Sequence, residues 1–141
     1  MNHTIILIGS NINPEINVFD AISLIQKKHK ILHESKFMYT NPVGFAKQPD
    51  FLNGMAFIAT HMDKDEFEQW LNETEAKLGR QRTQIKPGPR TIDLNLVTWN
   101  DKFVYADKKI MQERFFRKML FELLPKTEKV AGFEVELANN L

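Results

Sequence analysis

The order in which apolar patterns follow one another restricts the fold of this chain more than any other feature. Runs typical of β-strands occupy residues 4–8, 31–39, 51–60 and 91–99. Stretches with apolar residues at helical spacing lie between the first and second runs and between the third and fourth. The order strand, helix, strand, strand, helix, strand is that of a split βαβ arrangement. We therefore predict an α+β fold of the ferredoxin-like sandwich type, an antiparallel sheet covered by helices.

Local signals mark where the first two helices begin and end. Asn13 stands at a helix N-cap position, with Pro14 at the first helical position. Asp63, followed three residues later by Glu66, is typical of a capping box at the start of the second helix. Gly79 follows the last apolar residue of that helix and is expected to end it.

The C-terminal part of the chain predicts one more helix. This helix is expected to span residues 107–124. It should end there because Pro125 cannot continue it. A short strand is expected over residues 130–137. The side chains of the helix expected to point inward are Phe116, Met119, Leu120 and Leu123.

Composition assigns the chain to ordinary globular proteins and excludes other classes. Its 141 residues are enough for one domain with a sizeable core, so residues 1–141 are treated as a single domain. Nineteen basic and 18 acidic residues leave a net charge of +1, which does not indicate binding to bulk nucleic acid or to a membrane. The absence of cysteine fits a reducing compartment, and the apolar run at residues 5–8 is too short for a signal peptide. We expect a cytoplasmic protein.

Residues 88–96, Gly-Pro-Arg-Thr-Ile-Asp-Leu-Asn-Leu, place polar groups on one face of a predicted strand. Alternation along the strand directs Asp93 and Asn95 to one face and the apolar Ile92, Leu94 and Leu96 to the other. A buried carboxylate is costly unless it is paired or metal-bound, and two oxygen-bearing side chains at i and i+2 suit Mg²⁺. A half-exposed edge strand is the alternative interpretation.

Arginines surround this strand. Arg80 and Arg82 would project together from an extended loop, and Arg90 stands at the entrance of the predicted strand. The chain has neither a G-x-x-x-x-G-K-[ST] loop nor a G-x-G-x-x-G fingerprint, so any phosphates must be held by side chains. Three guanidiniums beside a metal-binding strand suit a polyphosphate and its transfer. The four histidines, which show no metal-ligand spacing and are expected on the surface, are His3, His29, His33 and His61.

Several separate motifs occur in a familiar order and spacing between Ile5 and Trp99, and more weakly as far as Pro125. They are Gly9-Ser10-Asn11, Thr40-Asn41-Pro42-Val43-Gly44, Gln48-Pro49-Asp50-Phe51-Leu52-Asn53, Glu75 with Leu78-Gly79-Arg80-Gln81-Arg82, residues 88–95, and Leu120-Phe121-Glu122. With these motifs the chain resembles the 6-hydroxymethyl-7,8-dihydropterin pyrophosphokinase family. The resemblance implies transfer of pyrophosphate from ATP to the pterin's hydroxymethyl oxygen in folate biosynthesis, with release of AMP.

The resemblance also implies a site in two parts. On the pterin side, Phe51 and Phe115 would stack on the two faces of the heterocycle; judged from the residues alone, both rings would be core residues. The other substrate-binding residues would be Thr40, Val43 and Asn53.

On the nucleotide side, the resemblance implies that ATP is bound by Asn72, Glu75, Arg80, Arg82 and Arg90. Mg²⁺ would be held by Asp93 and Asn95. The residues implied to take part in catalysis are Arg80, Arg82, Arg90 and Asp93.

The sequence departs from the family pattern at three places. Asn95 stands where the family has a second aspartate, and a neutral amide is a weaker ligand for Mg²⁺. Pro87 stands where the family has a tryptophan. The segment that supplies a histidine and further basic residues to the phosphates is missing or rebuilt as residues 101–113. Basic residues that would substitute for it are Lys108, Lys109, Arg114 and Arg117.

Three hypotheses follow for the function. The first is an active pyrophosphokinase with a rearranged metal site. The second is a family-derived protein that binds a pterin or nucleotide without turnover. The third is an interaction module whose arginines form a solvated face, and the joint presence of Arg80, Arg82, Arg90 and Asp93 argues against it. We favour the enzyme because the pocket and most phosphate ligands are present.

Overall fold

The computed structural model describes residues 1–44, 47–80 and 90–123. Six strands in these ranges form one open antiparallel sheet in the order β2-β4-β1-β5-β6, and β3 pairs with β4 beside this path. The strands are β1 (Asn2–Ser10), β2 (Lys30–Glu34), β3 (Met38–Thr40), β4 (Phe51–Thr60), β5 (Asp93–Trp99) and β6 (Lys102–Phe103). The helices are α1 (Pro14–Lys28), α2 (Lys64–Lys77), α3 (Lys108–Met111) and α4 (Arg114–Leu123).

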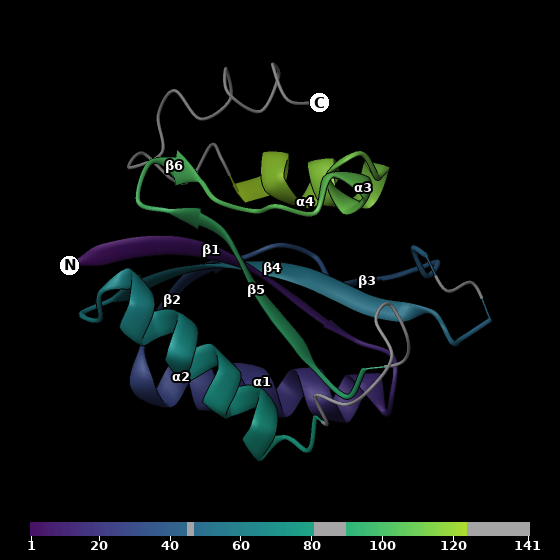
Figure 1. The fold of residues 1–141 in the computed structure, drawn as a ribbon, viewed down its shortest axis with the longest axis horizontal. Helices are drawn as coiled ribbons and strands as arrows, with labels where there is room; N and C mark the ends of the chain where they lie inside the picture. Colours follow the sequence, from purple (N-terminus) through teal and green to yellow (C-terminus); the bar gives the residue numbers. More distant parts are fainter. Residues whose placement is uncertain (45–46, 81–89, 124–141) are drawn as a thin grey trace.

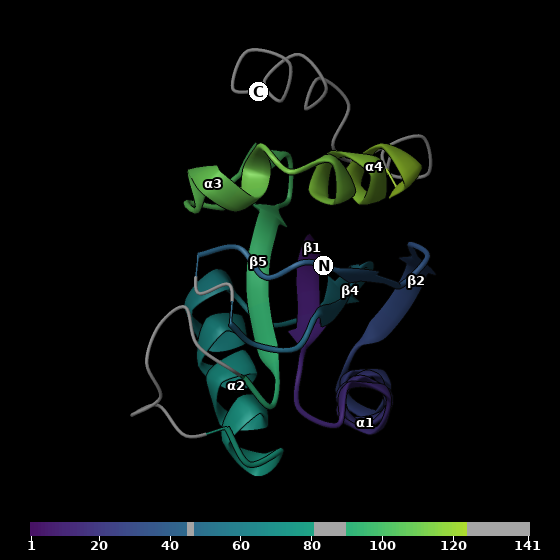
Figure 2. The same cartoon turned by 90° about the vertical axis from the view of Figure 1, so that its right-hand side faces the viewer.

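The sheet lies between two pairs of helices. Figure 1 shows α1 and α2 against one face of the sheet and α3 and α4 against the other, and the turned view in Figure 2 shows the same three layers. The predicted α+β class and the antiparallel sheet covered by helices are confirmed. In the described part of the chain, none of the helices has the length and apolar content that crossing a bilayer requires.

Strand β1 supplies both layers of the core. Ile6 and Ile8 are fully buried against α1 and α2, whereas Ile5 and Leu7 point to the opposite face and pack with residues of α4. Successive side chains of a strand alternate between faces, so a central strand covered on both sides must be apolar at every position. This explains the uninterrupted run at residues 5–8. The four α4 residues predicted to point inward are all buried.

The ends of the first two helices follow their sequence signals closely. The capping box of α2 is present: the Glu66 backbone N–H donates to Asp63 Oδ1 (2.9 Å), and the Asp63 N–H donates to Glu66 Oε1 (3.1 Å). Gly79 follows α2 with a φ of 90°, a left-handed conformation that glycine adopts without strain. Asn13 occupies the N-cap position of α1, but its side chain makes no capping hydrogen bond.

Two predicted elements are each divided in the structure. The strand expected over residues 31–39 is interrupted at Ser35, whose hydroxyl accepts the Met55 N–H (2.8 Å) in place of a backbone carbonyl. The helix expected over residues 107–124 is two helices, α3 and α4. Met111 and Phe116 are both buried in the same cluster, and five residues correspond to about 140° around one helix, so a continuous helix cannot bury both.

The remaining differences lie at the last strands. β5 begins at Asp93 rather than at Thr91, and the two-residue strand β6 was not predicted. The strand expected over residues 130–137 lies outside the described residues.

His29 is buried, contrary to the expectation that every histidine is on the surface. It follows α1 and contacts the rings of Phe67 (centroids 5.0 Å apart) and Trp70 (4.4 Å), and its Nδ1 is 2.9 Å from Thr60 Oγ1. Burial, reinforced by the positive charge of Lys28, lowers the pKa of His29 from 6.5 to about 4. The folded protein therefore favours the neutral imidazole.

This burial predicts a loss of stability in mild acid. The unfolded chain binds a proton at His29 near pH 6.5, whereas the folded protein does so only near pH 4. The free energy of unfolding is therefore highest above pH 6.5. It falls by about 2 to 3 kcal/mol as the pH decreases from 6.5 to about 4. Urea unfolding at several pH values should show a weaker pH dependence for His29→Gln, while the exposed control His61→Gln keeps the wild-type dependence. Equal pH dependence of wild type and His29→Gln would contradict the prediction.

Candidate active site

A row of residues crosses three neighbouring strands at one end of the sheet. Gly9 at the end of β1 pairs with Asn53 of β4 on one side and with Asp93 of β5 on the other. Directly paired residues point to the same face, which here is the face covered by α3 and α4. A Cβ atom at Gly9 would lie 2.4 Å from Asn53 Oδ1. Glycine is therefore required for the Asn53 amide to lie over the centre of this row.

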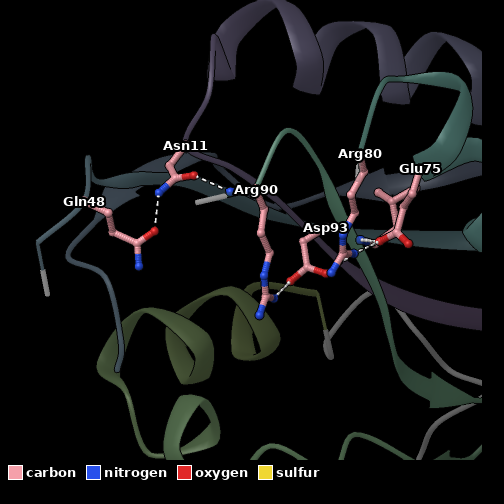
Figure 3. A network of polar contacts seen from close by, with 7 residues as sticks. Asn11, Gln48, Glu75, Arg80, Arg90 and Asp93 are labelled. Carbon is pink, nitrogen blue, oxygen red and sulfur yellow. Dashed lines mark hydrogen bonds and ion pairs between the residues drawn. The ribbon is translucent and has the colours of Figure 1, made fainter. Parts of the chain in front are cut away.

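Asp93 is held by two guanidiniums. Arg80 Nη1 donates to Asp93 Oδ1 (2.9 Å), and Arg90 Nη1 donates to Asp93 Oδ2 (2.6 Å). Figure 3 shows the three side chains in line. The side chain of Asp93 is 16% exposed and those of Arg80 and Arg90 are 8% and 18% exposed. Such partly desolvated charges require partners, and each of these three has an opposite charge in contact.

Glu75 fixes Arg80 from the other side. Its carboxylate is 3% exposed and accepts a hydrogen bond from Arg80 Nη1 (2.5 Å) and another from the backbone N–H of Leu94 (2.8 Å). Glu75 lies on α2 and Leu94 on β5, so one carboxylate joins the helix to the strand that carries Asp93. This makes Glu75 a positioning residue for the arginine.

Asn11 joins three loops around the site. Its Oδ1 accepts the Arg90 backbone N–H (2.8 Å), and its own backbone N–H donates to the Arg90 carbonyl (3.1 Å). The Asn11 Nδ2 donates to Gln48 Oε1 (2.8 Å) and to the Pro49 carbonyl (3.0 Å), as Figure 3 shows for Gln48. The turn after β1, the loop before β4 and the entrance of β5 are thus held together by one buried side chain.

Two adjoining pockets open at this end of the sheet. The first is narrow, with a volume of about 80 Å³, and lies between the sheet and the α3–α4 layer. The second, about 440 Å³, follows β5 toward α2 and the segment after β6. The residues that line both pockets are Arg90, Asp93, Asp107 and Ile110. Asp93 and its arginine therefore stand at the boundary between the two compartments.

The structure brings the predicted pterin-side residues together. Phe51 comes from β4 and Phe115 from α4, and both line the first pocket, as do Thr40, Val43 and Asn53. Asn53 Nδ2 donates to Thr40 Oγ1 (2.7 Å), which connects two of these residues directly. In the part of the chain that the structure describes, the rings of Phe51 and Phe115 border a pocket and are not enclosed in the core.

The predicted nucleotide-side residues divide into two groups. Asn72, Asn95 and Arg90 line the second pocket together with Asp93. Glu75 and Arg80 line neither pocket. They contact the second pocket only indirectly, because Arg80 binds Asp93 and Glu75 binds the backbone of β5. Arg82 lies outside the described residues.

The metal-binding capacity of the site is modest. No group of three or more acidic or histidine side chains able to hold a metal occurs in the part of the chain that the structure describes. Mg²⁺, however, is commonly bound by one or two protein oxygens, with substrate phosphates and water as the other ligands. Asp93 and Asn95, which both line the open pocket, fit an ion of that kind.

Sequence reasoning missed Tyr105 and Asp107, which follow β6. Asp107 Oδ1 accepts the backbone N–H groups of Lys109 and Ile110, and its residue lines both pockets. Tyr105 lines the second pocket, and burial, reinforced by the charges of Asp107 and Asp93, raises the pKa of its phenol. Neither residue belongs to a motif with a regular spacing, so the sequence offered no signal for them.

Fold and site together define a class of protein. It is an α+β protein with two adjoining pockets, and a carboxylate paired with two arginines lies where these pockets meet. The family model for 7,8-dihydro-6-hydroxymethylpterin-pyrophosphokinase (HPPK) matches residues 5–125. The chain belongs to this family.

Relatives with curated names agree with this assignment. The chain is 30% identical to the 2-amino-4-hydroxy-6-hydroxymethyldihydropteridine pyrophosphokinase of Bacillus subtilis over 96% of its own length and 82% of that protein. It is 36% identical to the protein of the same name in Campylobacter jejuni, over 72% of its own length and 65% of the relative. It is 35% identical to the "Bifunctional protein FolKE" of Lactococcus lactis over 92% of its own length. The chain spans only 39% of that bifunctional relative.

The role of Glu75 predicts a measurable loss of stability. Glu75→Gln keeps an acceptor for the Leu94 N–H but removes the charge that pairs with buried Arg80, so it should lower the free energy of unfolding by about 2 to 4 kcal/mol. Glu73→Gln, an exposed position on the same helix, should change it by less than about 0.5 kcal/mol. Urea denaturation followed by circular dichroism measures both values. Equal unfolding midpoints for the two variants would show that the Glu75 charge does not stabilise the site.

Proposed function

We propose that this protein transfers a pyrophosphoryl group from ATP to 6-hydroxymethyl-7,8-dihydropterin and releases AMP. The single observation that supports this most is the pair of adjoining pockets whose shared wall contains Arg90 and Asp93. A transfer between two ligands needs one compartment for each and a charged group where they meet. Family membership and the names of the relatives point to the same reaction.

The first pocket suits the pterin. Phe51 and Phe115 offer aromatic faces on which a planar heterocycle gains dispersion energy and loses contact with water. The Asn53 amide, oriented by Thr40, provides polar atoms for the edge of the heterocycle. Because Asp93 lines both pockets, we put the pterin's hydroxymethyl group near this residue, where the second pocket begins.

The second pocket suits the nucleotide. Arg90 faces it, and a guanidinium has five N–H donors, more than its contact with Asp93 uses. Asn72 adds a polar amide for the nucleotide at the α2 side. Asp93 and Asn95 would hold the Mg²⁺ that accompanies ATP, whose charge offsets that of the phosphates when bound. We also propose that Arg82 contributes a further guanidinium.

The proposed reaction displaces AMP at the β-phosphorus. The pterin hydroxymethyl oxygen attacks the β-phosphorus and loses its proton to solvent, the bond from that phosphorus to the oxygen bridging to the α-phosphate breaks, and AMP takes the electron pair. Arg80 and Arg90 hold the Asp93 carboxylate in place, since each of its oxygens accepts a guanidinium hydrogen bond. The chain's own contribution is therefore positioning and charge compensation, as is usual in phosphoryl transfer.

The proposal also includes the domain that carries the reaction and the compartment in which it takes place. Residues 1–141 would act as one pyrophosphokinase-like domain on two small molecules, and the absence of cysteine fits the cytoplasm.

The nucleotide product tests the proposal directly. Purified protein incubated with ATP, Mg²⁺ and 6-hydroxymethyl-7,8-dihydropterin should form AMP only when the pterin is present, as measured by liquid chromatography. Asp93→Ala should abolish the product, because it removes the carboxylate shared by both pockets. ADP as the product, or no product at high protein concentration, would overturn the proposed reaction. Tight binding of both ligands without product would favour the alternative of a binding protein.

Asn95 predicts an unusual dependence on Mg²⁺. Asn95→Asp adds a carboxylate beside Asp93 in the second pocket and should lower the Mg²⁺ concentration for half-maximal AMP formation by about tenfold or more. Gln112→Glu adds the same charge at an exposed residue that lines neither pocket and should leave this concentration unchanged. An unchanged Mg²⁺ dependence in Asn95→Asp would show that this position does not contribute to the metal site.

A further inference from the structure

The segment between β5 and α4 supplies the second pocket with an unexpected set of side chains. The basic residues that the sequence offered for phosphate binding, Lys108, Lys109, Arg114 and Arg117, line neither of the two pockets. The polar side chains from this segment that do line the second pocket are Tyr105 and Asp107. Of these two, only Tyr105 offers a hydrogen-bond donor to an anion.

The structure holds the Tyr105 ring firmly. Its ring is stacked on Phe116 of α4, with centroids 5.2 Å apart and planes inclined by 21°. The backbone N–H groups of Val104 and Tyr105 both donate to the Val97 carbonyl on β5, at 2.9 and 3.2 Å. A residue fixed by its backbone and by its ring has little freedom to lose when its hydroxyl binds a ligand.

The hydroxyl itself has no hydrogen-bond partner among residues 1–44, 47–80 and 90–123. It belongs to a half-buried residue, in a pocket that also contains Arg90 and Asp93. The hydroxyl is not among the buried polar atoms without a partner, so it is accessible from solvent, and a hydrogen bond to an ionised acceptor is stronger than one to a neutral group. The open volume beside Arg90 is where the proposed function puts the polyphosphate.

We propose that Tyr105 is a polyphosphate-binding residue whose hydroxyl donates a hydrogen bond to a phosphate oxygen of ATP in the second pocket. This inference rests on the proposed function. According to this inference, residues 101–113 contribute one neutral hydrogen-bond donor, the Tyr105 hydroxyl, in place of the basic side chains that the sequence led us to expect. A neutral donor is compatible with the nearby Asp93 and Asp107, because it adds no positive charge that these carboxylates would capture.

The chain contains an internal control, because it has two tyrosines. Tyr39 is 53% exposed, its hydroxyl donates to Glu15 Oε1 (3.1 Å), and it lines neither pocket. Protein labelled with 3-fluorotyrosine should give two ¹⁹F resonances, which Tyr39→Phe and Tyr105→Phe assign. Addition of ATP with Mg²⁺, or of inorganic tripolyphosphate, should shift the Tyr105 resonance and leave that of Tyr39 in place.

Calorimetric titration provides the second measurement. Tyr105→Phe keeps the ring on Phe116 and removes only the hydroxyl, so its affinity for ATP and for tripolyphosphate should fall about 10- to 100-fold. Its affinity for the pterin should stay within about twofold of wild type, and Tyr39→Phe should bind all three ligands as wild type does.

Each outcome decides the inference. A Tyr105→Phe variant with wild-type affinity for ATP would overturn the role of Tyr105 while leaving the proposed function intact. A wild-type protein that binds neither ATP nor tripolyphosphate would overturn both. If Tyr105→Phe binds every ligand weakly because its structure is disturbed, the ¹⁹F titration of the wild-type protein decides: a Tyr105 resonance that ATP does not shift would overturn the inference.

Discussion

The double contact of Asp93 with Arg80 and Arg90 is the interaction on which the rest of this structure depends. A carboxylate that is largely removed from water is stable only with charged partners, and each arginine in turn needs the carboxylate. Glu75 extends the contact to α2 and Asn11 extends it to the turn after β1. The polar network thus connects α2, the entrance of β5, the turn after β1 and the loop before β4, and Figure 3 shows its central part.

This network also gives the boundary between the pockets its chemical character. The apolar side of the site is provided by rings from β4 and α4, whereas the charged side is provided by the entrance of β5. Under the proposed function, a polyphosphate entering the open pocket would meet the Arg90 guanidinium, whose position is already fixed by Asp93, so little reorganisation would be needed on binding. Fixed charges of this kind are the main means by which a protein assists phosphoryl transfer, since the bond changes themselves need no covalent help.

The segment after β5 contributes residues to both pockets. It forms the two-residue strand β6, returns toward β5 through the hydrogen bonds to the Val97 carbonyl, and then passes into α3 and α4. Because the chain breaks between these helices, the side chains of Met111 and Phe116 both point into one apolar cluster. The same break brings Phe115 to the first pocket. Packing of the core and construction of the site are therefore achieved by the same few residues.

The sequence by itself determined the element order, the antiparallel α+β class, the capping box at Asp63 and the alternation of Asp93 with Leu94, because these follow from hydrophobic period and from bonds between near neighbours. Through the family resemblance it also supplied five of the residues that line the first pocket, namely Thr40, Val43, Phe51, Asn53 and Phe115. Only the tertiary structure decided the burial of His29, the interruption at Ser35 and the place of Tyr105 beside Asp93. Each of these depends on contacts between residues distant in the chain, whose geometry no local pattern encodes.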